Sequence, residues 1–321
     1  MCGIIGYVGN SKASPFIVEA LKRMEYRGYD SAGIATFDDN FIIKKGVGKV
    51  EELDEKLNFA EMNGTVGIGH TRWATHGNVT DENAHPHWSC KGDVVIVHNG
   101  IIENFLGLKE FLISRGHKFK SQTDSEVIAH LIEESIQNYG DLQSAITNAA
   151  TSLKGSYAFL VMLKSEPNLI IAVRKDAPLI VGLGSGENYL SSDVLGFISR
   201  TNQATFLDNK EIAFVTDSSA DFFDFTGKRI SKAPTTVAWK VSDVSKKEYL
   251  HYTLKEIHEQ PRAIGQTLSL DEHSLGRFVR AIKGTRDLFI TGCGTSYHAG
   301  LLMKYILAKT ARIKADVLLS S

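Results

Sequence analysis

The chain has 321 residues, of which 43% are hydrophobic and 23% charged, and its net charge is −1. This length predicts two domains, and without a stripe of basic residues we expect no nucleic-acid partner. No apolar run is long enough to span a bilayer, no signal-peptide layout opens the chain, and its three scattered cysteines form no disulfide framework. We therefore expect a cytoplasmic protein with no membrane partner.

The first 240 residues alternate between groups of strands and groups of helices. Strands are predicted at 3–8, 34–37, 41–45, 65–70 and 94–98. Ser14-Pro15 predicts the N-cap and first residue of one helix, and Thr123 to Glu126 has the pattern of a capping box for another, with residues 142–153 also helical. From 157 to 225 short strands follow one another. This grouping predicts a layered α+β domain up to about residue 240.

Residues 241–248 are polar and predict a linker. After them the pattern predicts helices at 249–260 and 277–283, and then one βαβ unit. Its strand at 287–291, turn at 292–296, helix at 297–309 and strand at 313–319 bring the chain to its last residues. Because one βαβ unit cannot cover both faces of a parallel sheet, we expect an incomplete α/β domain.

The second residue is the first candidate for chemistry. Removal of Met1 would leave Cys2 with both a thiol and a free α-amine. An α-amine titrates at about 7.7–8.0, so it can accept the proton of a thiol whose ordinary pKa is about 8.5. Nucleophile and general base would then belong to one residue. The alternative is a small buried side chain without chemistry.

Three further segments carry candidate binding groups. Arg72, within His70–Gly77, can bind a carboxylate through two parallel hydrogen bonds, or it is an ordinary surface arginine. Asn99-Gly100 is either a type I′ hairpin turn or a pair of donors that form an oxyanion hole. Asp124, in the first turn of its predicted helix, either interacts with the helix dipole or pairs with a substrate ammonium.

Two other features have weaker implications. His85 and His87 are close together but lack a third ligand, so we expect no metal site, and no cofactor is indicated. The turn at 292–296 joins a strand to a helix, where backbone N–H groups and hydroxyls can hold a phosphate. Alternatively, its glycines serve the tight turn alone.

Together these segments resemble the N-terminal-nucleophile glutamine amidotransferases, in particular those that aminate fructose 6-phosphate. The resemblance covers essentially the whole chain. It implies a four-layer αββα sandwich over residues 2–240 that hydrolyses glutamine to glutamate and ammonia, a linker at 241–248, and the start of a doubly wound sugar-isomerase domain at 249–321. The motifs that carry it are Cys2–Gly6, Glu25–Gly33, His70–Gly77, Asn83–His87, His98–Asn104, Thr123–His130, Lys255–Pro261 and Cys293–Gly300.

The resemblance also implies roles for individual residues. Cys2 attacks the carboxamide of glutamine, and Asn99 and Gly100 hold the resulting oxyanion. Arg72 binds the α-carboxylate of glutamine and Asp124 its α-ammonium. The other matched residues are one that orders the terminal amine, Arg27, and four that line or close the pocket: Trp73, Thr75, His76 and His85.

In the second domain the resemblance assigns Cys293, Gly294, Thr295 and Ser296 to a phosphate-binding loop for fructose 6-phosphate. In the family, the residues that isomerise the sugar lie beyond the point where this chain ends. We therefore expect this chain alone to be at most a glutaminase, whereas full-length members are expected to form homodimers and to make glucosamine 6-phosphate. The alternatives are an amidophosphoribosyltransferase-like enzyme, which matches these motifs less well, and a non-catalytic sensor of glutamine or a sugar phosphate.

Overall fold

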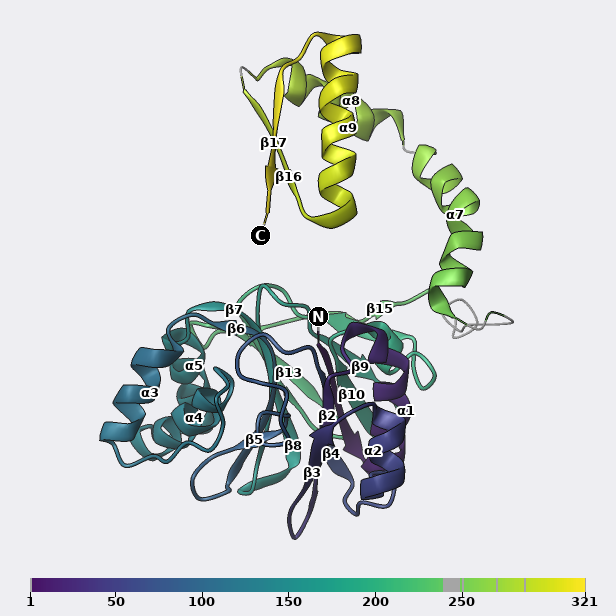
Figure 1. Ribbon diagram of the computed structural model, residues 1–321. Helices are drawn as coiled ribbons and strands as arrows, with labels where there is room; N and C mark the ends of the chain where they lie inside the picture. The colour runs from purple at the N-terminus through teal and green to yellow at the C-terminus, as the bar shows by residue number, and fades with distance from the viewer. Residues whose placement is uncertain (1, 239–248, 250, 270, 286, 321) are drawn as a thin grey trace. The chain divides into compact units, whose positions relative to one another are not determined.

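The computed structural model describes residues 2–238, 249, 251–269, 271–285 and 287–320. The chain divides into two compact units, Met1–Ser245 and Lys246–Ser321 (Figure 1). The linker predicted at 241–248 lies outside the described residues.

Two antiparallel sheets form the centre of the first unit. The eight-stranded sheet has the order β15 (Thr235–Thr236), β11 (Gln203–Phe206), β9 (Ile180–Leu183), β10 (Glu187–Ser191), β1 (Gly3–Gly9), β4 (Val66–Arg72), β2 (Ser31–Asp38) and β3 (Asn40–Val47). The seven-stranded sheet has the order β14 (Arg229–Ile230), β13 (Ala220–Asp224), β12 (Glu211–Val215), β8 (Glu166–Lys175), β7 (Gly155–Leu163), β6 (Val94–Ile102) and β5 (His87–Trp88).

Helices cover the outer faces of both sheets (Figure 1). Apolar residues of α1 (Ala13–Met24) and α2 (Val50–Leu57) pack on the eight-stranded sheet. On the other side, α4 (Glu126–Asn138) and α5 (Leu142–Ser152) pack on the seven-stranded sheet, with α3 (Phe105–Ser114) against α4. The predicted four-layer αββα arrangement is confirmed.

Strand β1 shows how the layers are joined. Successive side chains of a strand point to opposite faces, so Ile5 joins the core beneath α1 whereas Ile4 enters the core between the sheets. Gly6 also faces the second sheet, and a Cβ there would lie 2.9 Å from the Cδ1 atom of Leu160 in β7. The absence of a side chain at this position therefore allows the two sheets to approach closely.

Two predicted helix starts are wrong because tertiary contacts take their capping side chains. Helix α1 has Lys12 as its N-cap, while the hydroxyl of Ser14 donates to the carbonyls of Ala60 and Met62. Helix α4 has Ser125 as its N-cap with no side-chain capping bond. The carboxylate of Glu126 instead accepts hydrogen bonds from the backbone of residues 120 and 121.

The second unit contains the predicted βαβ segment. Strand β16 (Leu288–Gly292) leads into α9 (Gly294–Ala311), and β17 (Ala315–Leu319) pairs with β16 in parallel. Helix α7 (Tyr252–Leu268) continues beyond residue 260, where we expected its end, and has Pro261 inside it; α8 is Glu272–Lys283. None of the helices in the described ranges combines the length and apolar character that crossing a membrane requires.

The core between the sheets gives the first testable prediction. Leu160 is fully buried there, so Leu160→Ala is expected to lower the free energy of unfolding by about 2–5 kcal/mol. Leu106 on α3 is 64% exposed, and the control Leu106→Ala is expected to change it by less than about 0.5 kcal/mol. Urea unfolding measures both variants; equal losses would contradict this account of the core.

Candidate functional site

A cavity of about 360 Å³ opens at the edge where β1 begins and β4 ends. Cys2 immediately precedes β1, Arg72 ends β4, and Asn99 and Gly100 come from β6 of the other sheet. The cavity brings together all ten residues that the resemblance assigns to glutamine: Cys2, Arg27, Arg72, Trp73, Thr75, His76, His85, Asn99, Gly100 and Asp124.

The thiol of Cys2 contacts the backbone of Trp73. The Trp73 N–H donates to Cys2 Sγ at 3.2 Å, and Sγ lies 3.5 Å from the Trp73 carbonyl oxygen. Burial raises the pKa of the Cys2 thiol, and this effect exceeds the opposing ones of the Trp73 N–H and the positive charge of Arg72. A thiol with a raised pKa is protonated at neutral pH, so it would need a base to act as a nucleophile.

A buried histidine orients the amide of Asn99. Burial lowers the pKa of His70 to about 3, so its ring is neutral at neutral pH. Its Nε2 atom lies 3.0 Å from Asn99 Oδ1, while Asn99 Nδ2 donates to the carbonyl of Cys2 at 3.0 Å. The amide oxygen accepts, so the His70 proton is on Nε2. The amide N–H₂ thus faces the residue that carries the thiol.

Gly100 occupies a backbone conformation that requires glycine. Its φ is +124°, and a Cβ there would lie 2.1 Å from the carbonyl oxygen of Ser156. Asn99 and Gly100 also continue the ladder of β6 with β7, opposite Ala158 and Tyr157. The hairpin-turn alternative for this dipeptide is wrong.

Arg72 is buried, which excludes the surface-arginine alternative, and it holds the loop that follows β4. Only 3% of the residue is exposed. Nη1 donates to the carbonyl of Asn78 at 3.1 Å, and Nη2 to those of His76 at 2.5 Å and Gly77 at 3.2 Å. A guanidinium has five N–H donors, so these bonds leave donors for a ligand.

Asp124 is also buried, and it fixes the end of β6. Its Oδ2 atom accepts the backbone N–H of Ile102 at 2.7 Å. Asp124 lies two residues before α4, so its predicted place inside the first helical turn is wrong. The residue therefore presents a carboxylate to the cavity from the segment that leads into α4.

The remaining predicted residues form the rim and one wall. Arg27 is paired with Asp193, with 3.6 Å between Nη2 and Oδ2. Trp73 is 47% exposed and stacks edge-on against Tyr29. Thr75 is exposed in the loop after β4, where the ring of His76 packs edge-on against a phenylalanine of α3.

A cluster of buried imidazoles lies behind these groups. The ring of His85 is 4.1 Å from that of His70 and 4.6 Å from that of His87, between centroids. Burial, reinforced by neighbouring positive groups, lowers the pKa values of His85 and His87 well below the usual range. Burial also lowers the pKa of His98 to about 4, so all four rings are neutral at neutral pH.

Several cavity residues were given no role in the sequence prediction. His98 Nδ1 lies 2.8 Å from Ser125 Oγ, which ties β6 to the start of α4. Only its inward position in a strand next to Asn99 could have indicated that His98 lines the cavity. The other lining residues without a predicted role are Ile101, Thr123, Ser125, Ser156, Ala177 and Pro178.

The predicted phosphate loop lies in the second unit. Cys293 is the N-cap of α9, and Gly294 begins the helix with φ of +56°. Thr295 and Ser296 are exposed in the first helical turn, which starts three residues before the predicted position. Backbone N–H groups and two hydroxyls therefore occupy one helix N-terminus.

A family model described as a glutamine amidotransferase domain matches residues 54–261. The chain belongs to the glutamine amidotransferase family. Its curated relatives include enzymes named glutamine–fructose-6-phosphate aminotransferase (isomerizing), from Pyrococcus horikoshii (48% identical over 99% of this chain) and Aquifex aeolicus (46% over 100%). The chain spans about half the length of these relatives, 53% and 54%.

Solved structures agree with the amidotransferase fold. The glutamine phosphoribosylpyrophosphate amidotransferase from B. subtilis, complexed with ADP and GMP, has a TM-score of 0.61 and 28% identity. The match covers 70% of this amidotransferase chain and 49% of that one. A second structure, titled as the allosteric regulatory enzyme of purine biosynthesis, matches with a TM-score of 0.62.

The buried histidines of this amidotransferase predict acid sensitivity. An unfolded histidine takes up a proton near pH 6.5, whereas folded His70 and His98 do so only at about 3 and about 4. Between these values the unfolded state binds more protons, so the free energy of unfolding falls as pH falls. Between pH 6.5 and pH 5 each of these two rings is expected to lower the free energy of unfolding by about 2 kcal/mol.

Urea unfolding at pH 7 and pH 5, followed by tryptophan fluorescence, measures this loss. His70→Gln removes one titrating ring and is expected to lose less stability on acidification than the parent chain. His273→Gln, at an exposed position in α8, serves as the control and should lose as much as the parent. An unchanged pH dependence in His70→Gln would overturn the assignment.

Proposed function

We propose that this chain hydrolyses glutamine to glutamate and ammonia with Cys2 as the nucleophile, and that the ammonia is destined for fructose 6-phosphate. The observation that carries the proposal is that one cavity contains a thiol, a buried arginine, a buried carboxylate and an oriented amide. Free glutamine needs this set: a cation for its carboxylate, an anion for its ammonium, and a nucleophile with an oxyanion hole for its carboxamide.

The reaction begins with the amine of Cys2, freed by removal of Met1. The amine accepts the thiol proton, and the sulfur attacks the carboxamide carbon. The raised pKa of the thiol supports the need for such a base. Collapse of the tetrahedral intermediate breaks the C–N bond, and ammonia leaves with the proton held by the amine. Water then hydrolyses the thioester and releases glutamate.

Asn99 and Gly100 are proposed to stabilise the negative oxygen of the intermediate. One N–H of Asn99 Nδ2 is already used by the Cys2 carbonyl, which leaves the second for the oxyanion. The Cys2 carbonyl can only accept a hydrogen bond, so it fixes which end of the amide faces Cys2, and His70 Nε2 contacts the amide oxygen. Gly100 adds its backbone N–H from a conformation that a side chain would forbid.

Arg72 and Asp124 are proposed to recognise the two charged groups of the amino acid. Both are almost fully buried, at 3% exposure, so ion pairs with a ligand would form away from water. The loop that Arg72 holds carries the proposed pocket-lining residues Thr75 and His76. Arg27, anchored by Asp193, is proposed to order the amine of Cys2.

The second unit is proposed to begin the acceptor domain. We assign residues 2–240 to glutamine hydrolysis and residues 249–321 to the start of a doubly wound sugar-isomerase domain. The N-terminus of α9 supports a phosphate site at Cys293 to Ser296, because its N–H groups and hydroxyls suit an anion. All three cysteines are unpaired, which supports a reducing, cytoplasmic location.

Removal of the nucleophile or of the oxyanion donor tests the mechanism. Cys2→Ala is expected to lower the rate of ammonia release from glutamine by about 10⁴-fold or more. Asn99→Ala is expected to lower kcat by about 10²–10³-fold, because it removes one oxyanion donor. Asn168→Ala, at an exposed position of β8, is the matched control and should retain the parent rate. Persistent hydrolysis by Cys2→Ala would refute the mechanism.

Covalent labelling tests the nucleophile independently. A glutamine analogue with an electrophilic side chain is expected to modify Cys2 and to leave Cys90 and Cys293 unmodified, as read by peptide mapping. Intact-mass measurement is expected to show that Met1 has been removed. Retention of Met1 in an active preparation, or labelling at either of the other cysteines, counts against the proposed base and nucleophile.

A further inference from the structure

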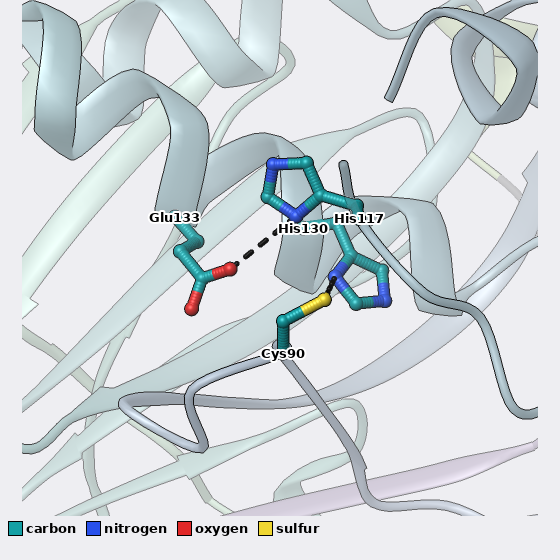
Figure 2. Close-up of side chains that lie close together, drawn as sticks. All are labelled: Cys90, His117, His130 and Glu133. Carbon is teal, nitrogen blue, oxygen red and sulfur yellow. Dashed lines mark hydrogen bonds and ion pairs between the residues drawn. The ribbon is translucent and has the colours of Figure 1, made fainter. Parts of the chain in front are cut away.

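Four side chains that can bind a metal gather outside the glutamine cavity. Cys90 lies in the loop between β5 and β6, His117 follows α3, and His130 and Glu133 are on α4 (Figure 2). One ligand atom from each residue lies within 4.8 Å of all the others. None of the four lines the glutamine cavity. We propose that these residues form a structural zinc site.

The spacing of the ligand atoms suits a tetrahedral ion. Cys90 Sγ lies 3.5 Å from His130 Nδ1, and His117 Nδ1 lies 3.3 Å from Glu133 Oε2. Zinc bond lengths of about 2.0–2.3 Å place the ligands of a tetrahedral site about 3.3–3.7 Å apart. Two pairs of ligand atoms already have this spacing. The largest separation between any two of the four ligand atoms needs to shorten by only about 1 Å.

Both imidazoles are oriented for metal binding. His117 Nε2 lies 3.3 Å from Glu134 Oε2, and His130 Nε2 lies 3.5 Å from Glu126 Oε1, so each Nδ1 atom faces the cluster (Figure 2). A carboxylate on the second ring nitrogen is the usual outer-shell arrangement of zinc-bound histidine. His117 is 8% exposed, and the contact of its Nδ1 atom with Glu133 at 3.3 Å lacks hydrogen-bond geometry.

Charge and ligand type favour zinc over other common cations. A Cys90 thiolate and the Glu133 carboxylate balance the charge of Zn²⁺, while the two histidines bind as neutral rings. The backbone N–H of Lys118 donates to Cys90 Sγ at 3.0 Å, and this bond would stabilise the charge of a metal-bound sulfur. Sulfur and imidazole ligands select against Ca²⁺ and Mg²⁺, which prefer oxygen. Four protein ligands fill a tetrahedron, so the role is structural.

The proposed ion would join three segments of the seven-stranded half of the first unit. It would attach α4 to the loop before β6 and to the segment that follows α3. Its ligands come from three separate segments and have none of the short Cys or His spacings of a zinc motif, which is why the sequence predicted no metal. His85 and His87, the pair considered there, belong instead to the glutamine cavity and its surroundings.

Metal titration of the purified chain tests the proposal. After removal of metal with a chelator, the protein is expected to bind one Zn²⁺ per chain in calorimetry and elemental analysis. Co²⁺ in its place is expected to give visible d–d bands and a thiolate charge-transfer band. Cys90→Ser should lose the charge-transfer band and bind Zn²⁺ at least about tenfold more weakly. His273→Gln, at an exposed histidine of α8, should bind Zn²⁺ as tightly as the parent chain.

A second variant separates metal binding from misfolding. Glu134→Gln leaves all four ligands in place, and loss of this outer-shell carboxylate is expected to weaken Zn²⁺ binding about 10–100-fold while the Co²⁺ charge-transfer band remains. Circular dichroism confirms that each variant is folded. If the parent chain binds no stoichiometric Zn²⁺, or if Cys90→Ser binds it equally well, the four side chains form only a hydrogen-bonded cluster and the proposal is wrong.

Discussion

Side chains of the two sheets pack against each other, and the cavity that contains Cys2 depends on this packing. Ile4 of β1 enters this core, and Gly6 allows Leu160 of the opposite sheet to come close to the strand. One sheet supplies Cys2 and the other supplies Asn99, whose amide reaches the Cys2 carbonyl at 3.0 Å. The distance between the proposed nucleophile and the proposed oxyanion donor is thus set by the packing of the two sheets.

Neutral imidazoles complement this arrangement. A protonated His70 or His85 would add positive charge beside Arg72 and compete for the carboxylate that Arg72 is proposed to bind. Burial prevents this by lowering the pKa values of both rings. His70 can then orient Asn99 through a hydrogen bond while Arg72 remains the charged group that faces the cavity. The imidazoles therefore add polar groups to the site without adding positive charge to that of Arg72.

Local sequence patterns predicted most of the fold and the residues that meet in the cavity, whereas long-range contacts account for the errors. Cys2 and Arg72 could be found because their motifs are short and adjoin predicted strands. Ser14 and Glu126 have the local pattern of helix caps, but distant backbone groups take their side chains. The close approach of the Ser156 carbonyl to Gly100 also lacked a local signal, because Ser156 lies on the neighbouring strand. The cluster around Cys90 needed the three-dimensional structure for the same reason.

The raised pKa of the Cys2 thiol affects how readily the sulfur is oxidised. Peroxides and other oxidants attack thiolates far faster than thiols. A sulfur kept protonated by burial, and held by the backbone of Trp73, is a poor target for sulfenic acid formation between encounters with substrate. Burial of the proposed nucleophile would thus limit its oxidation as well as create its need for a base.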